Sequence, residues 1–331
     1  MSPASKQQPV LVTGGGGFIG SNLVEALMRR GATVRVLDDF STGRRQNLEG
    51  AQSWGKESGG TLEVIEGNIC DADAVSRAMR DVRAVLHQAA IASVPRSVKD
   101  PVRTNEVSVR GTLLLLVAAR DAGVHRFVYA SSSSVYGESP VLPKVETMTP
   151  EPISPYGIAK LAAEKYVTVF HRIYGLGTVA LRYFNVFGPR QDPASEYAAV
   201  VPRFATAIMQ TGRPTIYGDG EQTRDFNPIA NVVEANLKSM EAPDAACGKA
   251  YNIAGGTRIS LLDLCRRLGT LAGREVAPIH EPPRVGDIRH SLADISAAKA
   301  ALGYTASVSL EQGIAIAFEH YRSLVGQGRG A

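Results

Sequence analysis

The stretch that decides the fold is Val10-Leu11-Val12-Thr13-Gly14-Gly15-Gly16-Gly17-Phe18-Ile19-Gly20. A short apolar run ends at Thr13, and the glycines lead directly into an apolar helical pattern that continues to Arg30. Glycine lets the backbone turn tightly and approach an anion, which the free N–H groups and positive dipole at a helix start attract. The stretch predicts a strand, a phosphate-binding turn and a helix. Its glycine spacing alone is also found in ordinary strand-turn-helix connections.

The same alternation of short strands and longer helices continues along the chain. Strands are expected at residues 33–37, 62–66, 84–88, 126–130 and 178–181, with helices at 72–79, 106–122 and 156–173. Strands separated by helices form a parallel sheet that is covered on both faces. We therefore predict an α/β fold, a doubly wound parallel sheet of the Rossmann type, with a dinucleotide-binding domain over residues 9–185.

After Tyr183 the pattern is less regular and richer in proline and glycine. Apolar helical stretches are expected at residues 200–210, 231–240, 260–271 and 310–324. We predict that residues 186–325 form mainly a smaller C-terminal substrate-binding lobe over the carboxyl edge of the sheet, with room for segments that return to the first domain.

Composition and charge exclude several classes of partner. The net charge of +4 comes from 36 basic and 32 acidic residues that are scattered along the chain, so nucleic-acid binding is not expected. Cys70, Cys247 and Cys265 are far apart and lack the spacing of a zinc site, so no metal is expected. No apolar run reaches the ~18 residues of a membrane span, and residues 1–8 do not resemble a signal peptide. We expect a cytoplasmic protein with no membrane partner.

An acidic pair supports a dinucleotide site. The second expected strand ends in Leu37-Asp38-Asp39, about 18 residues after Gly20, where a carboxylate accepts hydrogen bonds from an adenosine ribose. The carboxylate of Asp38 repels a 2′-phosphate and favours NAD over NADP, although Arg44 and Arg45 lie close by. The glycine turn and the acid together predict bound NAD.

Tyr156 and Lys160 form a Y-x-x-x-K pair on one face of an expected helix. A nearby cation lowers the pKa of a phenol, which makes proton abstraction by Tyr156 feasible. The pattern also arises by chance, as an aromatic residue on a core face beside a solvated lysine. Ser131-Ser132-Ser133-Ser134 follows the expected strand at 126–130, at the strand end where doubly wound sheets bind ligands, although four serines are equally typical of a polar loop.

Five motifs together are far more specific. They are Val12-Thr13-Gly14-x-x-Gly17-Phe18-Ile19-Gly20, His87-Gln88-Ala89-Ala90, Ser131-Ser132-Ser133-Ser134-Val135-Tyr136-Gly137, Ser154-Pro155-Tyr156-Gly157-x-x-Lys160 and Leu181-Arg182-Tyr183-Phe184-Asn185-Val186-Phe187-Gly188-Pro189. On these residues the chain resembles the NAD-dependent nucleotide-sugar epimerase/dehydratase family of extended short-chain dehydrogenases. The resemblance covers residues 9–322 and is strongest to the UDP-glucose and UDP-N-acetylglucosamine 4-epimerases.

The resemblance implies a mechanism and an NAD site. Tyr156 would take the proton of the sugar 4-hydroxyl, Ser132 would share the hydrogen bond, and Lys160 would tune the phenol and hold the nicotinamide ribose. Hydride would leave C4 for tightly held NAD, and the 4-keto sugar would turn and take it back on its other face. The implied cofactor contacts are Gly14, Gly17, Phe18, Ile19, Gly20, Asp38, Asp39, Ser41, Thr42, Gly43, Asn68, Ile69, Gln88, Ala89, Ala90, Tyr156, Lys160 and Tyr183.

The resemblance also implies a UDP-sugar site. Asn185 would bind on the diphosphate side, Arg224 would hold a phosphate, and Arg284 with Asp287 would hold phosphate and ribose, because arginine forms paired charge-assisted hydrogen bonds with phosphate. Each arginine taken alone is more simply an exposed surface charge. The implied substrate contacts are Ser93, Arg96, Ser132, Ser133, Asn185, Val200, Tyr217, Arg224, Arg284, Asp287 and Ser291.

Two comparisons within the family narrow the expected reaction. Sugar 4,6-dehydratases carry an Asp-Glu pair where this chain has Ser133 and Ser134, so epimerisation is favoured. In the epimerases, a tyrosine four residues after the position of Asp287 restricts the pocket to sugars without an acetyl group, and here that residue is Ser291. We expect interconversion of UDP-N-acetylglucosamine and UDP-N-acetylgalactosamine, with uronic acids as an alternative because Arg96 could meet a carboxylate.

Other possibilities stay open at this point. They are a UDP-glucose or UDP-uronic acid 4-epimerase, a one-way nucleotide-sugar dehydrogenase or reductase, and a non-catalytic dinucleotide sensor. The family pattern also implies a homodimer formed through residues 106–122 and 156–173. The chain departs from the pattern at Asn68, at Ser108 and at Asn227-Pro228-Ile229-Ala230.

Overall fold

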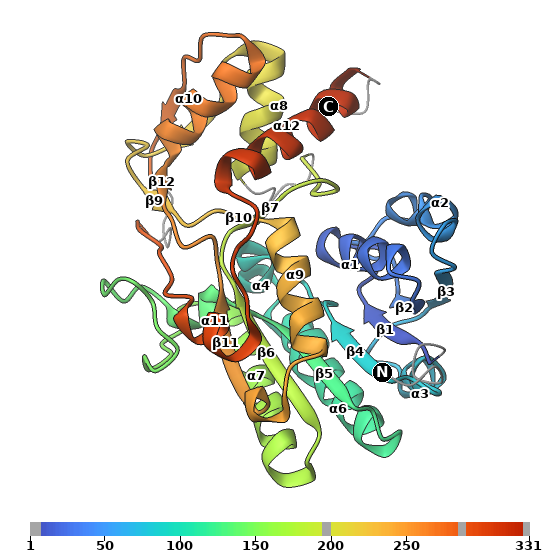
Figure 1. Ribbon diagram of the computed structural model, residues 1–331. Helices are drawn as coiled ribbons and strands as arrows, with labels where there is room; N and C mark the ends of the chain where they lie inside the picture. The colour runs from blue at the N-terminus through green and yellow to red at the C-terminus, as the bar shows by residue number, and fades with distance from the viewer. Residues whose placement is uncertain (1–7, 194–199, 284–288, 327–331) are drawn as a thin grey trace.

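A computed structural model describes residues 8–193, 200–283 and 289–326 of the chain (Figure 1). Its centre is a seven-stranded parallel sheet in the order β11-β6-β5-β4-β1-β2-β3. The strands are β1 (Val10–Thr13), β2 (Thr33–Asp38), β3 (Thr61–Glu66), β4 (Ala84–His87), β5 (Arg126–Ser132), β6 (Gly177–Tyr183) and β11 (Lys249–Ile253). The strand order reverses between β1 and β4, and such a switch point opens a crevice at the carboxyl ends of the strands. The predicted Rossmann-type sheet is confirmed.

Helices cover both faces of this sheet. One face carries α1 (Phe18–Arg29), α2 (Ala51–Gly55), α9 (Ile229–Met240) and α11 (Ser296–Leu302), and the other carries α3 (Ala72–Met79), α6 (Thr112–Asp121) and α7 (Pro155–Tyr174). Successive strand residues point to opposite faces, so Val10 and Val12 pack beneath α1 while Leu11 packs beneath α3 and α6. Both faces of β1 are buried, and this explains its unbroken apolar run.

A second core lies in the smaller lobe. It is formed by α8 (Val200–Thr211), α10 (Leu261–Ala272) and α12 (Leu310–Gly326), which lie together at the top of Figure 1. Short strands surround these helices: β7 (Val186–Phe187) pairs with β10 (Asn227–Pro228), β9 (Thr223–Arg224) with β12 (Ile259–Ser260), and β8 (Thr215–Tyr217) with β13 (Ile279–Glu281). Because β7 comes directly after β6, the lobe begins at the carboxyl end of the sheet.

Two parts of the chain differ from the sequence-based expectation. The strand β11 was not predicted; it pairs with β6 while α9 packs on the sheet, so both are segments that return to the first domain, for which the expected boundary left room. The helix expected at 106–122 begins earlier, as α5 (Pro101–Asn105), continues through a π-helical turn (Glu106–Gly111) into α6, and is preceded by α4 (Val94–Lys99). Short 3₁₀ turns lie at Arg45–Leu48, Ser133–Tyr136 and Asp244–Ala246.

Among the residues that the structure describes, no helix is both long enough and apolar enough to cross a membrane.

Candidate active site

The glycine turn opens onto a cavity of about 240 Å³ at the carboxyl end of β1. Gly14 has φ +70°, and a Cβ there would lie 2.7 Å from the backbone nitrogen of Ala89. A Cβ on Gly20 would lie 2.1 Å from the carbonyl oxygen of Gly14. Helix α1 starts at the cavity without a side-chain cap, and the first N–H groups of a helix have no acceptor within the helix. These groups suit a diphosphate, so the cavity fits a dinucleotide.

Asp38 fixes the shape of this turn. Its two carboxylate oxygens accept hydrogen bonds from the backbone N–H groups of Gly16 and Phe40, each at 2.8 Å. Burial raises the pKa of Asp38, and the two backbone hydrogen bonds oppose that effect. Asp38 also lines the cavity.

Nearly all of the expected cofactor residues share this one cavity. It is lined by Gly14, Gly17, Phe18, Ile19, Gly20, Asp38, Asp39, Ser41, Thr42, Gly43, Asn68, Ile69, Gln88, Ala89 and Ala90. Leu37, Gly67, Ile91, Ala92, Arg103 and Val107 also line it, and the sequence analysis did not single them out. Tyr156, Lys160 and Tyr183 do not line the cavity.

Buried hydrogen bonds tie the cavity wall to its surroundings. The amide of Asn236 donates to the Tyr183 hydroxyl at 2.8 Å, the Tyr183 hydroxyl donates to Gln88 at 3.3 Å, and Gln88 donates back to Asn236 at 3.1 Å. One strand away, the ring of His87 lies between the hydroxyls of Thr13 (2.7 Å) and Thr112 (2.9 Å). Asn236 comes from α9, which the sequence analysis placed in the lobe.

Ser132, Tyr156 and Lys160 lie together at the carboxyl end of β5. Ser132 is hydrogen-bonded to the Tyr156 hydroxyl, and the Ser132 Oγ also accepts the backbone N–H of Ser134 at 3.1 Å. The Nζ of Lys160 lies 5.9 Å from the centre of the Tyr156 ring and donates to the carbonyl oxygen of Ala130 at 2.8 Å. The structure thus brings the three expected catalytic residues into one group.

The first turn of α7 fixes the position of Tyr156. Ser154 caps this helix by accepting the backbone N–H of Gly157 at 3.1 Å. The hydroxyl of Ser97, on α4, accepts the backbone N–H of Tyr156 itself at 3.0 Å. Two serines from different parts of the chain therefore fix the helix turn that carries Tyr156.

One electrostatic expectation was wrong. Burial raises the pKa of Tyr156, and the hydrogen bond with Ser132 opposes this without overcoming it. Burial also lowers the pKa of Lys160 to about 7. The sequence analysis expected the lysine charge to lower the tyrosine pKa, but it could not include the burial of both groups, which disfavours each charged form.

Asp225 is a buried acid in contact with two of the expected substrate residues, Asn185 and Ser291. Asp225 accepts the backbone N–H groups of Gly255 at 2.9 Å and Ala293 at 3.2 Å, and burial raises its pKa to about 6. The amide of Asn185 donates to the carbonyl oxygen of Asp225 at 3.1 Å and to the hydroxyl of Ser291 at 3.0 Å. The backbone N–H of Asp225 donates to the same hydroxyl at 3.3 Å. Asn185 and Ser291, which are far apart in the sequence, therefore touch.

The other expected substrate residues occupy several elements. Ser93 caps α4 by accepting the N–H of Arg96, Ser133 begins the 3₁₀ turn after β5, Val200 begins α8 and packs on the lobe core, Tyr217 ends β8, and Arg224 on β9 donates to the carbonyl oxygen of Arg289. Arg284 and Asp287 lie outside the described residues.

Asn68 and Pro228, two of the departures from the family pattern, make defined local contacts. Asn68 donates to Asp39 at 2.8 Å and accepts the N–H of Cys70 at 2.8 Å, so its amide bridges two segments beside the cavity. Pro228 directly precedes α9 and packs against Gly313 of α12, where a Cβ would lie 2.4 Å from the proline ring. The Ser108 hydroxyl is buried in the π-helical turn without a hydrogen-bond partner.

Within the described residues, no group of three or more His, Cys, Asp or Glu side chains is arranged to hold a metal ion. The cysteines Cys70, Cys247 and Cys265 are free.

Comparison with known proteins agrees with this geometry. The family model of the NAD dependent epimerase/dehydratase family matches residues 10–254. The chain is 39% identical over 315 residues to the UDP-glucose 4-epimerase of Mycolicibacterium smegmatis, covering 95% of this chain and 98% of that protein.

Two solved structures resemble this chain to the same degree. One is the UDP-glucose 4-epimerase of Thermotoga maritima with UDP-glucose, and the other is the UDP-N-acetylglucosamine 4-epimerase of Methanobrevibacter ruminantium with UDP-N-acetylmuramic acid. Each has a TM-score of 0.88 and 38% identity and covers 96% of this chain and 99% of its own. The chain belongs to the NAD-dependent epimerase/dehydratase family, and its cofactor is NAD.

Proposed function

We propose that this enzyme inverts C4 of UDP-linked hexoses and that its preferred substrates are the N-acetylated pair UDP-N-acetylglucosamine and UDP-N-acetylgalactosamine. The grouping of Ser132, Tyr156 and Lys160 beside the dinucleotide cavity carries the proposal of epimerase chemistry. The solved relatives with bound UDP-sugars support the substrate class.

In this proposal Tyr156 accepts the proton of the sugar 4-hydroxyl and Ser132 orients that hydroxyl through its own hydrogen bond. When bound, NAD would supply reversible hydride acceptance at C4 and a positive charge, which would favour the phenolate of Tyr156 and oppose the effect of burial on its pKa. The Lys160 ammonium donates a hydrogen bond to the carbonyl oxygen of Ala130, and in this proposal it would also hold the nicotinamide ribose.

Ser133 and Ser134 support epimerisation over dehydration. Removing water across C5 and C6 of the sugar needs an acid and a base. The residues at these positions offer only hydroxyl groups, and that of Ser134 accepts a hydrogen bond from the Ser132 hydroxyl at 3.1 Å. A serine hydroxyl is a poor substitute for a carboxyl group in either role. We expect that no 4-keto-6-deoxy sugar accumulates when the enzyme is incubated with its substrate.

The proposed preference for acetylated sugars depends on the size of residue 291. The small side chain of Ser291 is held by Asn185 and by the backbone of Asp225. The Asn185 amide and the backbone N–H of Asp225 both donate to the Ser291 oxygen. The hydroxyl proton of Ser291 therefore points away from them and is available to an acceptor such as an acetamido carbonyl. A tyrosine at this position would fill that space.

The variant Ser291→Tyr tests the preference. We expect a loss of at least tenfold in kcat/KM for UDP-N-acetylglucosamine, because a single steric conflict in a pocket costs ~1–3 kcal/mol. The kcat/KM for UDP-glucose should change little. Equal losses for both sugars would contradict the proposed role of Ser291.

We also propose that the enzyme forms a homodimer through α7 and its neighbours. Ile158, Tyr166, Val169 and Ile173 are exposed along one face of α7, and Val102 on the adjacent α5 is 73% exposed. An apolar stripe of this kind can pack against the same stripe of a second copy. In such a dimer the two subunits are related by a twofold axis and use the same surface.

The dimer can be tested with Ile173→Lys and a matched control. Sedimentation of the wild type should give twice the chain mass, and Ile173→Lys should shift the mass toward one chain. Ile316→Lys, at an isoleucine on α12 that is 52% exposed where Ile173 is 65% exposed, should leave the dimer intact. A monomeric wild type, or dissociation by Ile316→Lys alone, would contradict the proposed interface.

A further inference from the structure

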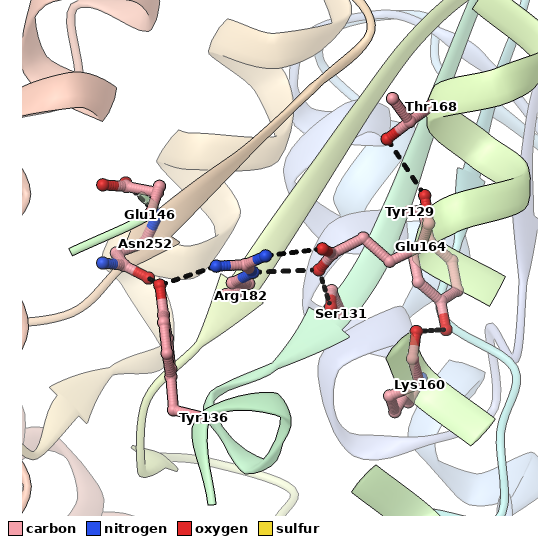
Figure 2. A network of polar contacts seen from close by, with 9 residues as sticks. All are labelled: Tyr129, Ser131, Tyr136, Glu146, Lys160, Glu164, Thr168, Arg182 and Asn252. Carbon is pink, nitrogen blue, oxygen red and sulfur yellow. Dashed lines mark hydrogen bonds and ion pairs between the residues drawn. The ribbon is translucent and has the colours of Figure 1, made fainter. Parts of the chain in front are cut away.

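A buried ion pair joins α7, the helix that carries Tyr156 and Lys160, to β6. Glu164 on α7 and Arg182 on β6 have side chains that are only 3% and 4% exposed. The guanidinium donates to both carboxylate oxygens, from Nη2 to Oε1 at 2.7 Å and from Nε to Oε2 at 3.0 Å. Figure 2 shows this bidentate contact between α7 and β6. The proposed chemistry assigns no role to either residue.

Glu164 of this pair lies close in the sequence to Lys160 and contacts Ser131, the neighbour of Ser132. Lys160 and Glu164 are one turn apart on the same face of α7. Along β5, the carbonyl oxygen of Ala130 accepts the Lys160 ammonium at 2.8 Å, and the next residue, Ser131, donates its hydroxyl to Glu164 at 2.6 Å. The residue after that is Ser132. Successive residues of one strand thus contact successive turns of the catalytic helix.

The network continues toward the substrate side. Arg182 donates to the Tyr136 hydroxyl at 2.8 Å, and that hydroxyl donates to the amide oxygen of Asn252 at 2.7 Å. The amide nitrogen of Asn252 donates to the carbonyl oxygens of Lys144 at 3.0 Å and Asp294 at 3.2 Å. Asp294 lies three residues beyond Ser291, so one chain of hydrogen bonds joins the catalytic helix to the segment that carries the proposed gate.

This geometry resists small movements of α7. Burial alone would lower the pKa of Arg182, but its hydrogen bond and charge interaction with Glu164 outweigh that effect and raise the pKa. A shift or rotation of the helix would separate the two buried charges and leave each without its partner, which is costly in a low-dielectric interior. The planar guanidinium fits the carboxylate in a single orientation, so the contact fixes direction as well as distance.

We propose that Glu164 and Arg182 are positioning residues for the reaction: their ion pair sets α7 against the ends of β5 and β6 and so holds Tyr156 and Lys160 in register with Ser132. The proposal rests on the proposed epimerase function. It predicts that loosening the pair slows the chemical step more than it weakens the binding of either the UDP-sugar or NAD.

The variant Arg182→Lys tests this role. Lysine keeps the positive charge but cannot contact both carboxylate oxygens and Tyr136 at once. We expect a loss in kcat of roughly 100-fold, the cost of a misplacement of about 1 Å, with KM and the content of bound NAD within about twofold of wild type. Glu164→Asp, which draws the carboxylate back by one methylene group, should show the same pattern if Arg182→Lys fails to fold.

Arg126→Lys is the matched control. Arg126 is the first residue of β5, at the end of the strand opposite Ser132. It is 2% exposed and donates to the carbonyl oxygen of Ala242 at 2.8 Å and to Asp244 at 3.2 Å. The variant Arg126→Lys should lower the midpoint of thermal unfolding, as Arg182→Lys does. Its kcat, however, should stay within about twofold of wild type when measured well below both midpoints.

Each outcome is decisive. Unchanged kcat in the folded Arg182→Lys and Glu164→Asp proteins, or an equal loss of kcat in Arg126→Lys, would overturn the positioning role and leave the pair as a source of stability only. A loss that appears entirely in KM or in NAD content would overturn it as well. A wild-type protein that binds NAD but inverts no UDP-sugar would instead contradict the proposed function, so the two failures can be told apart.

Discussion

The buried carboxyl group of Asp225 should make the stability of this protein depend on pH in a way that a single substitution removes. Its side chain is fully buried, and burial raises its pKa from 3.8 to about 6 despite hydrogen bonds from the backbone of Gly255 and Ala293. The folded state therefore holds the proton more tightly than the unfolded state, and this contribution to stability is lost as the pH rises from about 4 through about 6.

The size of the effect follows from the shift. A change of about two pKa units at ~1.36 kcal/mol per unit gives about 2 to 3 kcal/mol between pH 4 and pH 7. Asp225→Asn cannot ionise and should lack this loss. We would measure urea unfolding of both proteins at several pH values and follow the difference between their free energies of unfolding, in which the titration of all other groups cancels.

Between pH 4 and pH 7, the free energy of unfolding of the wild type should fall by about 2 to 3 kcal/mol relative to that of Asp225→Asn. Asp219→Asn is a suitable control, because Asp219 lies on an exposed loop nearby and its hydrogen bond with Arg289 lowers its pKa instead. A difference between wild type and Asp225→Asn that stays constant with pH would refute the reasoning.

Three further predictions concern the cofactor and catalytic groups. Tyr156→Phe should lower kcat by ~10²- to 10⁴-fold while purified protein keeps its NAD, and activity near wild type would rule out the tyrosine as base. Gly20→Ala places a Cβ 2.1 Å from the oxygen of Gly14 and should abolish NAD retention, measured by absorbance after purification, whereas Gly326→Ala, with open space around it, should retain NAD. Burial lowers the pKa of His87 to about 3, so its ring nitrogens should show no titration by NMR between pH 5 and pH 8, and a midpoint near 6 would contradict the full burial of the ring.

Much of the first domain was predictable from local pattern. The strand at Val10–Thr13, the glycine turn and the start of α1 lie where the alternation of strand and helix placed them, because each segment is buried in the way its own sequence suggests. The loop residues expected to contact the cofactor gather at one cavity for the same reason: the carboxyl ends of neighbouring parallel strands meet at one edge of a sheet.

The features that escaped prediction depend on contacts between distant segments. Lys249–Ile253 is a short run with a mixed pattern, and only its place beside β6 makes it a strand of the main sheet. Glu164 and Lys160 could be taken for an ordinary surface pair on a helix, yet Glu164 is buried against Arg182. The pKa of Tyr156 was predicted in the wrong direction because the burial of a side chain is set by the whole fold.

The most direct test of the proposed function is an NMR assay of C4 inversion. Purified enzyme would be given UDP-N-acetylglucosamine or UDP-glucose separately, without reductant. The proposal predicts that the galacto epimer appears mainly from the acetylated sugar and that no NADH accumulates. Net formation of NADH, or no inversion of either sugar by protein that carries NAD, would contradict it.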